Sequence, residues 1–174
     1  MAIAGLDGEL TAYLKASSAA DLPRDYEHLR RQRLVVETAR DGGWAPSFEE
    51  RVSPDRASSV IDVVLRRARR REVAVVEVWD WFSDIGDAVR SHAAKVATIR
   101  RAPDWTVSGL LVVRGTRRNR ELARDFGSLL ATRYHRSSTA WLRALTDADA
   151  AMPTTSGFLW TDVGGARLLV ARLS

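Results

Sequence analysis

The stretch Ser58–Trp81, SSVIDVVLRRARRREVAVVEVWDW, decides the fold of this chain. It holds two short, strongly apolar runs rich in β-branched residues, a composition typical of buried strands. The residues between them, Arg66–Arg71, are almost all arginine and predict the turn of a hairpin. We therefore expect two antiparallel strands, at Ser58–Leu65 and Glu72–Trp81.

Helices and further strands are predicted on both sides of this hairpin. Before it, a short helix is expected within the first 20 residues and a longer one from Asp25 to about Arg40. Helical spacing directs Leu29 and Val36 of the longer helix inward, with Val35 and Ala39 beside them. Further strands are expected at 44–52, 105–113, 158–163 and 166–173. Further helices are expected at 84–101, 120–133 and 139–145.

This order of elements predicts an α/β fold with a mixed central sheet flanked by helices on both faces. We expect a single domain over 1–174, because no linker divides the chain. Within it we distinguish an N-terminal helical extension (1–22), a core (25–135), and a helix with a terminal β-hairpin around Gly164-Gly165 (136–174).

The composition is that of an ordinary globular protein. The 174 residues are 45% hydrophobic and 28% charged, and no apolar run approaches the roughly 18 residues of a membrane span. The chain has no cysteine, which excludes disulfides, thiolate metal sites and cysteine nucleophiles. The first residues lack the pattern of a signal peptide, so we expect a cytoplasmic protein that does not contact a membrane.

The charge is basic and carried almost entirely by arginine. Lys and Arg number 27 against 22 Asp and Glu, a formal net charge of +5, and only Lys15 and Lys95 are lysines. Arginine binds phosphate well, so a DNA partner is expected; the alternative is a solvated surface that reflects a GC-rich genome. The candidate nucleic-acid-binding residues surround the start of a predicted helix and are Arg114, Arg117, Arg118 and Arg120. Arg66–Arg71 form a second cluster, and a DNA groove requires both clusters on one edge.

Several common catalytic patterns are absent. The chain has no phosphate-binding glycine loop, no HExxH and no GxSxG. Its three histidines, His28, His92 and His135, lie far apart in the sequence. These absences exclude most simple hydrolases and nucleotide-binding proteins.

Two acids inside the apolar strands are the strongest candidates for a site. Asp62 lies within VIDVV and Glu77 within VVEVW, where an ionised carboxylate is costly unless it is paired or bound to a metal. The hairpin can bring both acids to one place, and two carboxylates are suitable ligands for Mg²⁺ or Mn²⁺. The alternative is that each acid pairs with one of the many arginines.

From about Asp25 to Val113, and over the helix that follows, the chain resembles the core of the PD-(D/E)XK, or restriction-endonuclease-like, nucleases. The resemblance lies in the order helix, three strands with Asp on the second and Glu on the third, helix, strand. It implies that Asp62 and Glu77 bind Mg²⁺ (or Mn²⁺) and that the chain cleaves DNA phosphodiesters. It also implies an assisting acid on the first helix, for which Glu37 is the candidate; the alternative for Glu37 is an ion pair with Arg33.

The chain departs from this family at the motif lysine. The family places it two residues after the Glu, where this chain has Trp79. Some relatives carry the basic residue on the next helix, which makes Lys95 the catalytic candidate here, with Arg90 as an electrostatic substitute. The literal pair Pro54-Asp55 is a rival for the first half of the motif, but its surroundings predict a surface turn.

The sequence therefore predicts a metal-dependent nuclease, with Asp62, Glu77, Lys95 and Glu37 at its site. The first alternative is a catalytically degenerate nuclease fold that binds DNA, regulates or senses a ligand; the second is a protein-interaction module. Formation of a homodimer is left open. Four tryptophans are expected in the core or at its rim (Trp44, Trp105, Trp141 and Trp160), whereas Trp79 or Trp81 could stack on a base.

Overall fold

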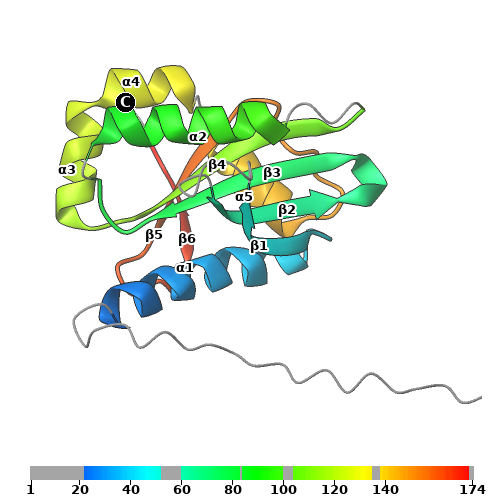
Figure 1. The fold of residues 1–174 in the computed structure, drawn as a ribbon, viewed down its shortest axis with the longest axis horizontal. Helices are drawn as coiled ribbons and strands as arrows, with labels where there is room; N and C mark the ends of the chain where they lie inside the picture. The colour runs from blue at the N-terminus through cyan, green and yellow to red at the C-terminus, as the bar shows by residue number, and fades with distance from the viewer. Residues whose placement is uncertain (1–21, 52–59, 83, 100–103, 135–137, 173–174) are drawn as a thin grey trace, which may run out of the picture.

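The structure is a computed structural model that describes residues 22–51, 60–82, 84–99, 104–134 and 138–172 (Figure 1). The helices in this part of the chain are α1 (Leu22–Arg40), α2 (Ile85–Ile99), α3 (Arg117–Asp125), α4 (Gly127–Arg133) and α5 (Ser138–Thr146). The strands are β1 (Ala45–Arg51), β2 (Val60–Arg67), β3 (Glu72–Trp79), β4 (Thr106–Arg114), β5 (Gly157–Thr161) and β6 (Leu168–Val170). A short 3₁₀ helix, η1 (Ala68–Arg70), joins β2 to β3.

The strands form one mixed sheet in the order β1-β2-β3-β4-β5-β6. β1, β2 and β3 are antiparallel neighbours, β3, β4 and β5 run parallel, and β6 is antiparallel to β5. The predicted central and terminal hairpins and the mixed α/β sheet are therefore confirmed. Because β3 and β4 are parallel, their carboxyl ends lie together at one edge, where Trp79 is in register with Val113.

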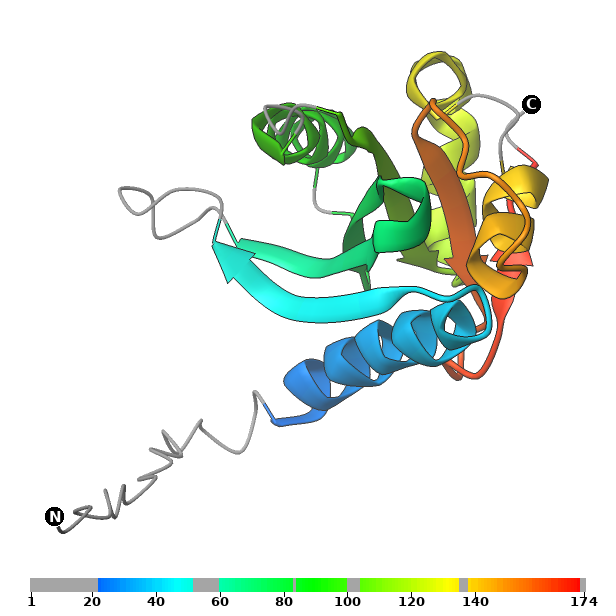
Figure 2. The same ribbon diagram turned by 90° about the vertical axis from the view of Figure 1, so that its right-hand side faces the viewer.

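Helices cover both faces of the sheet, as predicted (Figures 1 and 2). α1 and α5 pack on one face, where Ala74, Val76 and Val78 of β3 join the hydrophobic core. α2, α3 and α4 pack on the other face, which receives Val73 and Val75 of the same strand. β3 is therefore buried on both sides, which explains its continuous apolar sequence.

Some predicted boundaries and one predicted core residue are wrong. The helix expected over 120–133 is two helices, α3 and α4, which meet at Phe126. The terminal strands are shorter than expected, since β5 ends at Thr161 and β6 holds only Leu168–Val170. Leu29 of α1 is 52% exposed, whereas Val35 and Ala39 are fully buried; the inward stripe therefore lies in the C-terminal half of α1. The helix expected within 1–20 and the pair Pro54-Asp55 lie outside the described residues.

The tryptophans expected to pack in the interior do so. Trp44, Trp141 and Trp160 are buried, and Trp105 is partly buried against the cluster between α2 and the sheet. In the described part of the chain, no helix has the length and apolar character needed to cross a membrane.

Candidate functional site

The site lies where β2 and β3 stop pairing. Their antiparallel ladder runs from Arg67↔Glu72 to Val63↔Val76 and ends there. Beyond it, side-chain carboxylates take the place of the backbone carbonyl groups as hydrogen-bond acceptors. The Asp62 N–H donates to Glu77 Oε1 (3.4 Å), and the Val78 N–H donates to Asp62 Oδ2 (2.7 Å). The two acids of the sequence prediction are therefore neighbours, each bonded to the other strand.

The backbone around Asp62 departs from regular strand geometry. Ile61 belongs to the cluster under α2 and Val63 to the cluster under α1, so two residues that should share a face lie on opposite faces. On β1, Glu49 lies between Phe48 and Glu50, which pair with Val63 and Ile61, and it has φ +49°, a left-handed conformation that is uncommon for a residue other than glycine. This distortion lets helices on both faces of the sheet reach the acid pair.

Glu77 is a buried acid with an altered pKa. Its side chain is only 5% exposed. Burial is the largest cause and the negative charge of Asp62 the second, and together they raise the pKa of Glu77 to about 7. Lys95 opposes this rise, because its Nζ lies 2.6 Å from Glu77 Oε2. Metal-free Glu77 therefore exchanges its proton near neutral pH.

Lys95 reaches Glu77 because α2 is held close to the sheet. One turn earlier on α2, His92 Nε2 lies 3.1 Å from the Val75 carbonyl oxygen and Nδ1 lies 3.0 Å from the Tyr134 hydroxyl. Burial lowers the pKa of His92 to about 4. Under the ring, Gly109 of β4 has no side chain, and a Cβ there would lie 2.7 Å from His92 Cε1. A larger residue at Gly109 would push away the helix that carries Lys95.

The opposite face supplies a histidine from α1. His28 Nε2 lies 3.5 Å from Asp62 Oδ1, and its Nδ1 lies 3.9 Å from Asp80 Oδ2. The hydrogen bond to Asp62 raises the pKa of His28, against the effect of burial. Gln32, one turn later, lies 2.9 Å from His28 Nε2 through its side-chain nitrogen. The carboxylates of Asp62 and Asp80 thus stabilise the charged form of the His28 ring relative to its neutral form.

Asp80 adds a third carboxylate directly after β3. Its Oδ1 lies 2.5 Å from Nη1 of Arg31, a residue whose side chain is fully buried. Arg31 also bonds to Glu27 on the preceding turn of α1 and to the Val163 carbonyl oxygen. These contacts hold the first turns of α1 against the end of β3. The positive charge of Arg31 balances the negative charge of the Asp80 carboxylate.

The predicted catalytic residues are only partly brought together. Asp62, Glu77 and Lys95 meet in the site described above. Glu37 lies nine residues after His28, about 13 Å along α1 at 1.5 Å per residue. There it accepts a hydrogen bond from Arg33 Nε at 2.7 Å, the ion pair weighed as the alternative. Arg90 is exposed and pairs with Asp87 on its own helix.

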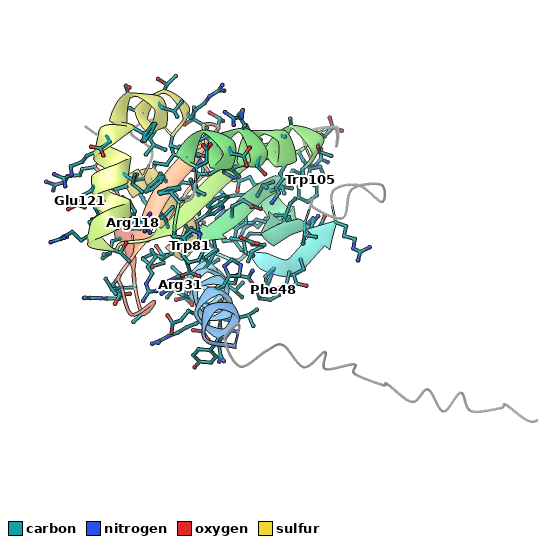
Figure 3. The ribbon with its side chains drawn as sticks, turned by 60° about the vertical axis from the view of Figure 1, so that its left-hand side comes forward. Arg31, Phe48, Trp81, Trp105, Arg118 and Glu121 are labelled. Carbon is teal, nitrogen blue, oxygen red and sulfur yellow. The ribbon has the colours of Figure 1, made fainter. Side chains whose placement is uncertain are left out.

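The arginines around the start of α3 lie beside the site. Asn119 is buried, and its Nδ2 donates to the carbonyl oxygens of Asp80 (2.9 Å) and Arg114 (2.8 Å). This bond joins the start of α3 to the segment after β3. Arg117 and Arg118, immediately before Asn119, are exposed. Arg118 is labelled in Figure 3.

The other two members of this group are engaged with the protein itself. Arg114 donates from Nε to the Val163 carbonyl oxygen. Arg120 donates to the Gly115 carbonyl oxygen, and its guanidinium lies 5.0 Å from the centre of the Trp160 ring. Arg117 pairs with Glu121 on its own helix at 3.5 Å but is 92% exposed, and Arg118 is exposed as well. Arg117 and Arg118 are therefore the members of the predicted group most accessible to phosphate.

The second arginine cluster lies at the far end of the hairpin. Arg67 is five residues from Asp62, about 16 Å along an extended strand. Arg67 is buried, donates to Glu72 Oε2 at 2.6 Å and 2.8 Å, and lies over the Trp44 ring. Arg66 pairs with Glu50. Arg67 and Arg66 thus hold the hairpin together, and the two arginine clusters do not line one edge.

The residues that surround the acids were not predicted from the sequence. Asp80 stands three residues after Glu77, at the carboxyl end of the strand, and its position was a usable signal. His28, Arg31 and Gln32 follow the spacing i, i+3, i+4, which puts them on one face of a helix. A polar face at the start of a helix that covers the acid-bearing strands could have indicated that α1 contributes to the site.

A cavity of about 420 Å³ lies elsewhere, between α2, α4 and the segment before β5. Val96, Tyr134 and Ser156 are among its lining residues, and neither Asp62 nor Glu77 is. The polar groups of His92 and Tyr134 in its wall are bonded to each other. The chemistry of the acid pair, rather than this cavity, therefore identifies the candidate site.

The acid pair offers carboxylate oxygens, the type of ligand that a hard divalent cation takes. Within the described residues, no cluster of three or more His, Asp or Glu side chains is arranged to hold a metal. Mg²⁺ needs only one or two carboxylates when waters and substrate phosphates complete its shell. The raised pKa of Glu77 reflects in part an unfavourable charge that such a cation would neutralise.

Comparisons with known proteins add no further assignment to this geometry. No protein-family model matches the chain, and no curated protein and no solved structure shows significant similarity to it.

Proposed function

We propose that this chain is a divergent nuclease of the PD-(D/E)XK type, with a restriction-endonuclease-like core, that hydrolyses DNA phosphodiesters with Mg²⁺ or Mn²⁺. The observation that carries the proposal is the meeting of Asp62, Glu77 and Lys95 at the end of the β2–β3 ladder. The order α1, β1, β2, β3, α2, β4 supports it, because the resemblance to this family rests on that order.

Asp62 and Glu77 are the residues that would hold the cation, which lowers the pKa of a bound water when present. Hydrolysis forms a bond from the water oxygen to phosphorus, breaks the bond to the leaving sugar oxygen, and delivers a proton to that oxygen. We assign the binding of phosphate to Arg117 and Arg118, because the Asn119–Asp80 bond joins the start of their helix to the end of the strand that carries Glu77.

Lys95 orients the reactants in this proposal. An ammonium group has three hydrogen-bond donors, of which one is used by Glu77 Oε2. The remaining donors can hold the attacking water or a phosphate oxygen. Lys95 thereby supplies from α2 the positive charge that the motif lysine supplies from the strand, and Trp79 packs instead against Phe82, with 6.2 Å between ring centres.

A second candidate is a catalytically degenerate nuclease fold that binds DNA without cleaving it. Two observations favour it: Trp79 stands at the position of the motif lysine, and the ammonium of Lys95 already neutralises Glu77. In that case Glu77 stabilises the fold through its pair with Lys95 and does not bind a metal, so Glu77→Gln leaves DNA binding unchanged.

Calorimetric titration with Mn²⁺ separates the two candidates. We expect the wild type to bind the ion and Asp62→Asn to lose binding. Asp125→Asn, which changes an exposed acid at the end of α3, is the matched control and should bind as the wild type does. The titration is repeated with duplex and single-stranded DNA present, because substrate phosphates complete the shell of such ions.

Cleavage of circular duplex and circular single-stranded DNA is measured in parallel. The nuclease proposal requires products that depend on Mg²⁺ and on Asp62. Absence of metal binding with and without DNA contradicts it and supports the degenerate fold.

A further inference from the structure

Exposed apolar side chains come from the chain segments that flank the acid pair. In the described part of the chain, seven large hydrophobic residues are clearly exposed, and four of them come from segments next to the site. We call these four the apolar rim: Tyr26, Leu29, Phe48 and Trp81. Apolar side chains gathered at one place on a surface usually mark a binding surface.

Each member of the apolar rim belongs to a segment that also carries a residue of the site or pairs with one. Tyr26 and Leu29 belong to the turn of α1 that carries His28, which contacts Asp62. Phe48 is in register with Val63, the neighbour of Asp62, and Trp81 follows Asp80 directly. Phe48 and Trp81 are 50% and 52% exposed and lie on the face of the molecule seen in Figure 3.

We propose that the apolar rim binds unpaired bases, and that the substrate of the site is single-stranded DNA; this rests on the proposed nuclease function. An aromatic ring binds a base through its face. In a duplex that face is covered by the neighbouring base pairs, whereas in a single strand it is accessible. An exposed tryptophan next to the acids therefore favours a strand whose bases are unpaired at the point of cleavage.

The charge beside the rim favours nucleic acid over a protein partner. Asn119 bonds to the carbonyl oxygen of Asp80, the residue before Trp81, and follows Arg117 and Arg118 in the chain. The segment that carries Trp81 is thus bonded to the start of the helix that carries these two exposed arginines. Aromatic rings for the bases next to arginines for the phosphates are the usual components of a single-strand binding surface. The net charge of +5 agrees with such a partner.

The two tryptophans at the end of β3 have different roles in this proposal. Trp79 is partly buried, packs against Phe82 and belongs to the core under α2. Trp81, two residues later, lies beyond the end of the strand and is exposed. Trp81 is therefore the residue to change when base stacking is tested.

The test measures fluorescence anisotropy of a labelled DNA strand of about 12 nucleotides, the length that a surface of this kind covers, alone and as a duplex. EDTA is present, so that neither cleavage nor metal binding enters the result. We expect the single strand to bind more tightly than the duplex, Trp81→Ala to weaken single-strand binding about tenfold, and Trp81→Phe to restore most of it. Phe126→Ala removes an exposed aromatic residue at the junction of α3 and α4 and should have no effect.

Unchanged single-strand binding by Trp81→Ala overturns the proposal, as does an equal loss for the duplex. Sedimentation velocity tests whether the apolar rim instead binds a second copy of the chain. If the wild type is a dimer and Trp81→Ala is a monomer, the rim is a dimer interface and the proposal is wrong. Failure of the proposed nuclease function gives a different result. In that case the wild type neither binds Mn²⁺ nor cleaves DNA, while its binding to single-stranded DNA still depends on Trp81.

Discussion

Lys95 Nζ lies 2.6 Å from Glu77 Oε2, although the two residues are 18 positions apart and belong to a helix and a strand. The pair is largely shielded from solvent, since the side chain of Lys95 is 12% exposed and that of Glu77 is 5% exposed. Asp62 stands on the other side of Glu77 and acts against ionisation of that carboxyl group. Glu77 is therefore placed between a cation that favours its charge and an anion that opposes it.

Removal of Lys95 should affect stability in a pH-dependent way. In Lys95→Met the buried Glu77 carboxylate loses its partner, so the free energy of unfolding at pH 8 should fall by about 1–3 kcal/mol. At pH 5 Glu77 is largely protonated, and the loss should be much smaller. Urea unfolding at both pH values measures the difference; equal losses would mean that Lys95 acts through packing alone.

Glu77 should make the metal-free protein less stable as the pH rises. Its pKa is about 7 in the folded protein against 4.5 as the ordinary value, so the folded state holds a proton that the unfolded state has released. Stability should therefore decrease from about pH 4.5 to about pH 7, by up to about 3 kcal/mol, and stay level above that.

The comparison of wild type with Glu77→Gln isolates this contribution. His92, with its pKa lowered to about 4, destabilises the protein as the pH falls below 6.5, which is the opposite slope, and it is present in both proteins. Urea unfolding in EDTA should show Glu77→Gln gaining stability relative to wild type between pH 5 and pH 8. A constant difference would show that Glu77 ionises as an ordinary carboxyl group.

Arg67 should matter for stability and not for DNA. It is buried, pairs with Glu72, and donates to the carbonyl oxygens of Gly42 and Ala150. Arg67→Met leaves Glu72 as a buried charge without its partner and should cost about 3–5 kcal/mol of unfolding free energy. The control Arg69→Ala changes an exposed arginine of η1 and should alter stability by less than about 0.5 kcal/mol. A loss of DNA affinity in Arg69→Ala would show that the arginines of the β2–β3 hairpin do contribute to DNA binding.

Arg118 should contribute to DNA binding through charge alone. Its side chain is exposed at the start of α3 (Figure 3), so Arg118→Ala should leave the melting temperature nearly unchanged. The slope of log K against log salt should decrease in magnitude by about 1, the value for one phosphate contact. Arg143→Ala on α5, on the opposite face of the sheet, is the control for net charge. Equal slopes in the two variants would show that binding depends on total charge and not on position.

The sequence alone determined the sheet and the acid pair. Apolar β-branched runs on either side of Arg66–Arg71 predict a hairpin because only buried strands tolerate such runs, and the polar turn fixes their antiparallel pairing. An acid within each run indicated a site, since an isolated buried carboxylate is costly. The order of the elements then predicted a mixed sheet with helices on both faces, as observed.

Only the tertiary structure decided which distant residues surround those acids. Periodicity reports which side of a helix faces the core, but not how far along the sheet the helix is placed. The contact of His28 with Asp62, the contact of Lys95 with Glu77 and the distance of Glu37 from both depend on that placement. The same holds for arginine, whose role is set by its partners: Arg67 pairs with Glu72 in the core, whereas Arg118 is exposed beside the site.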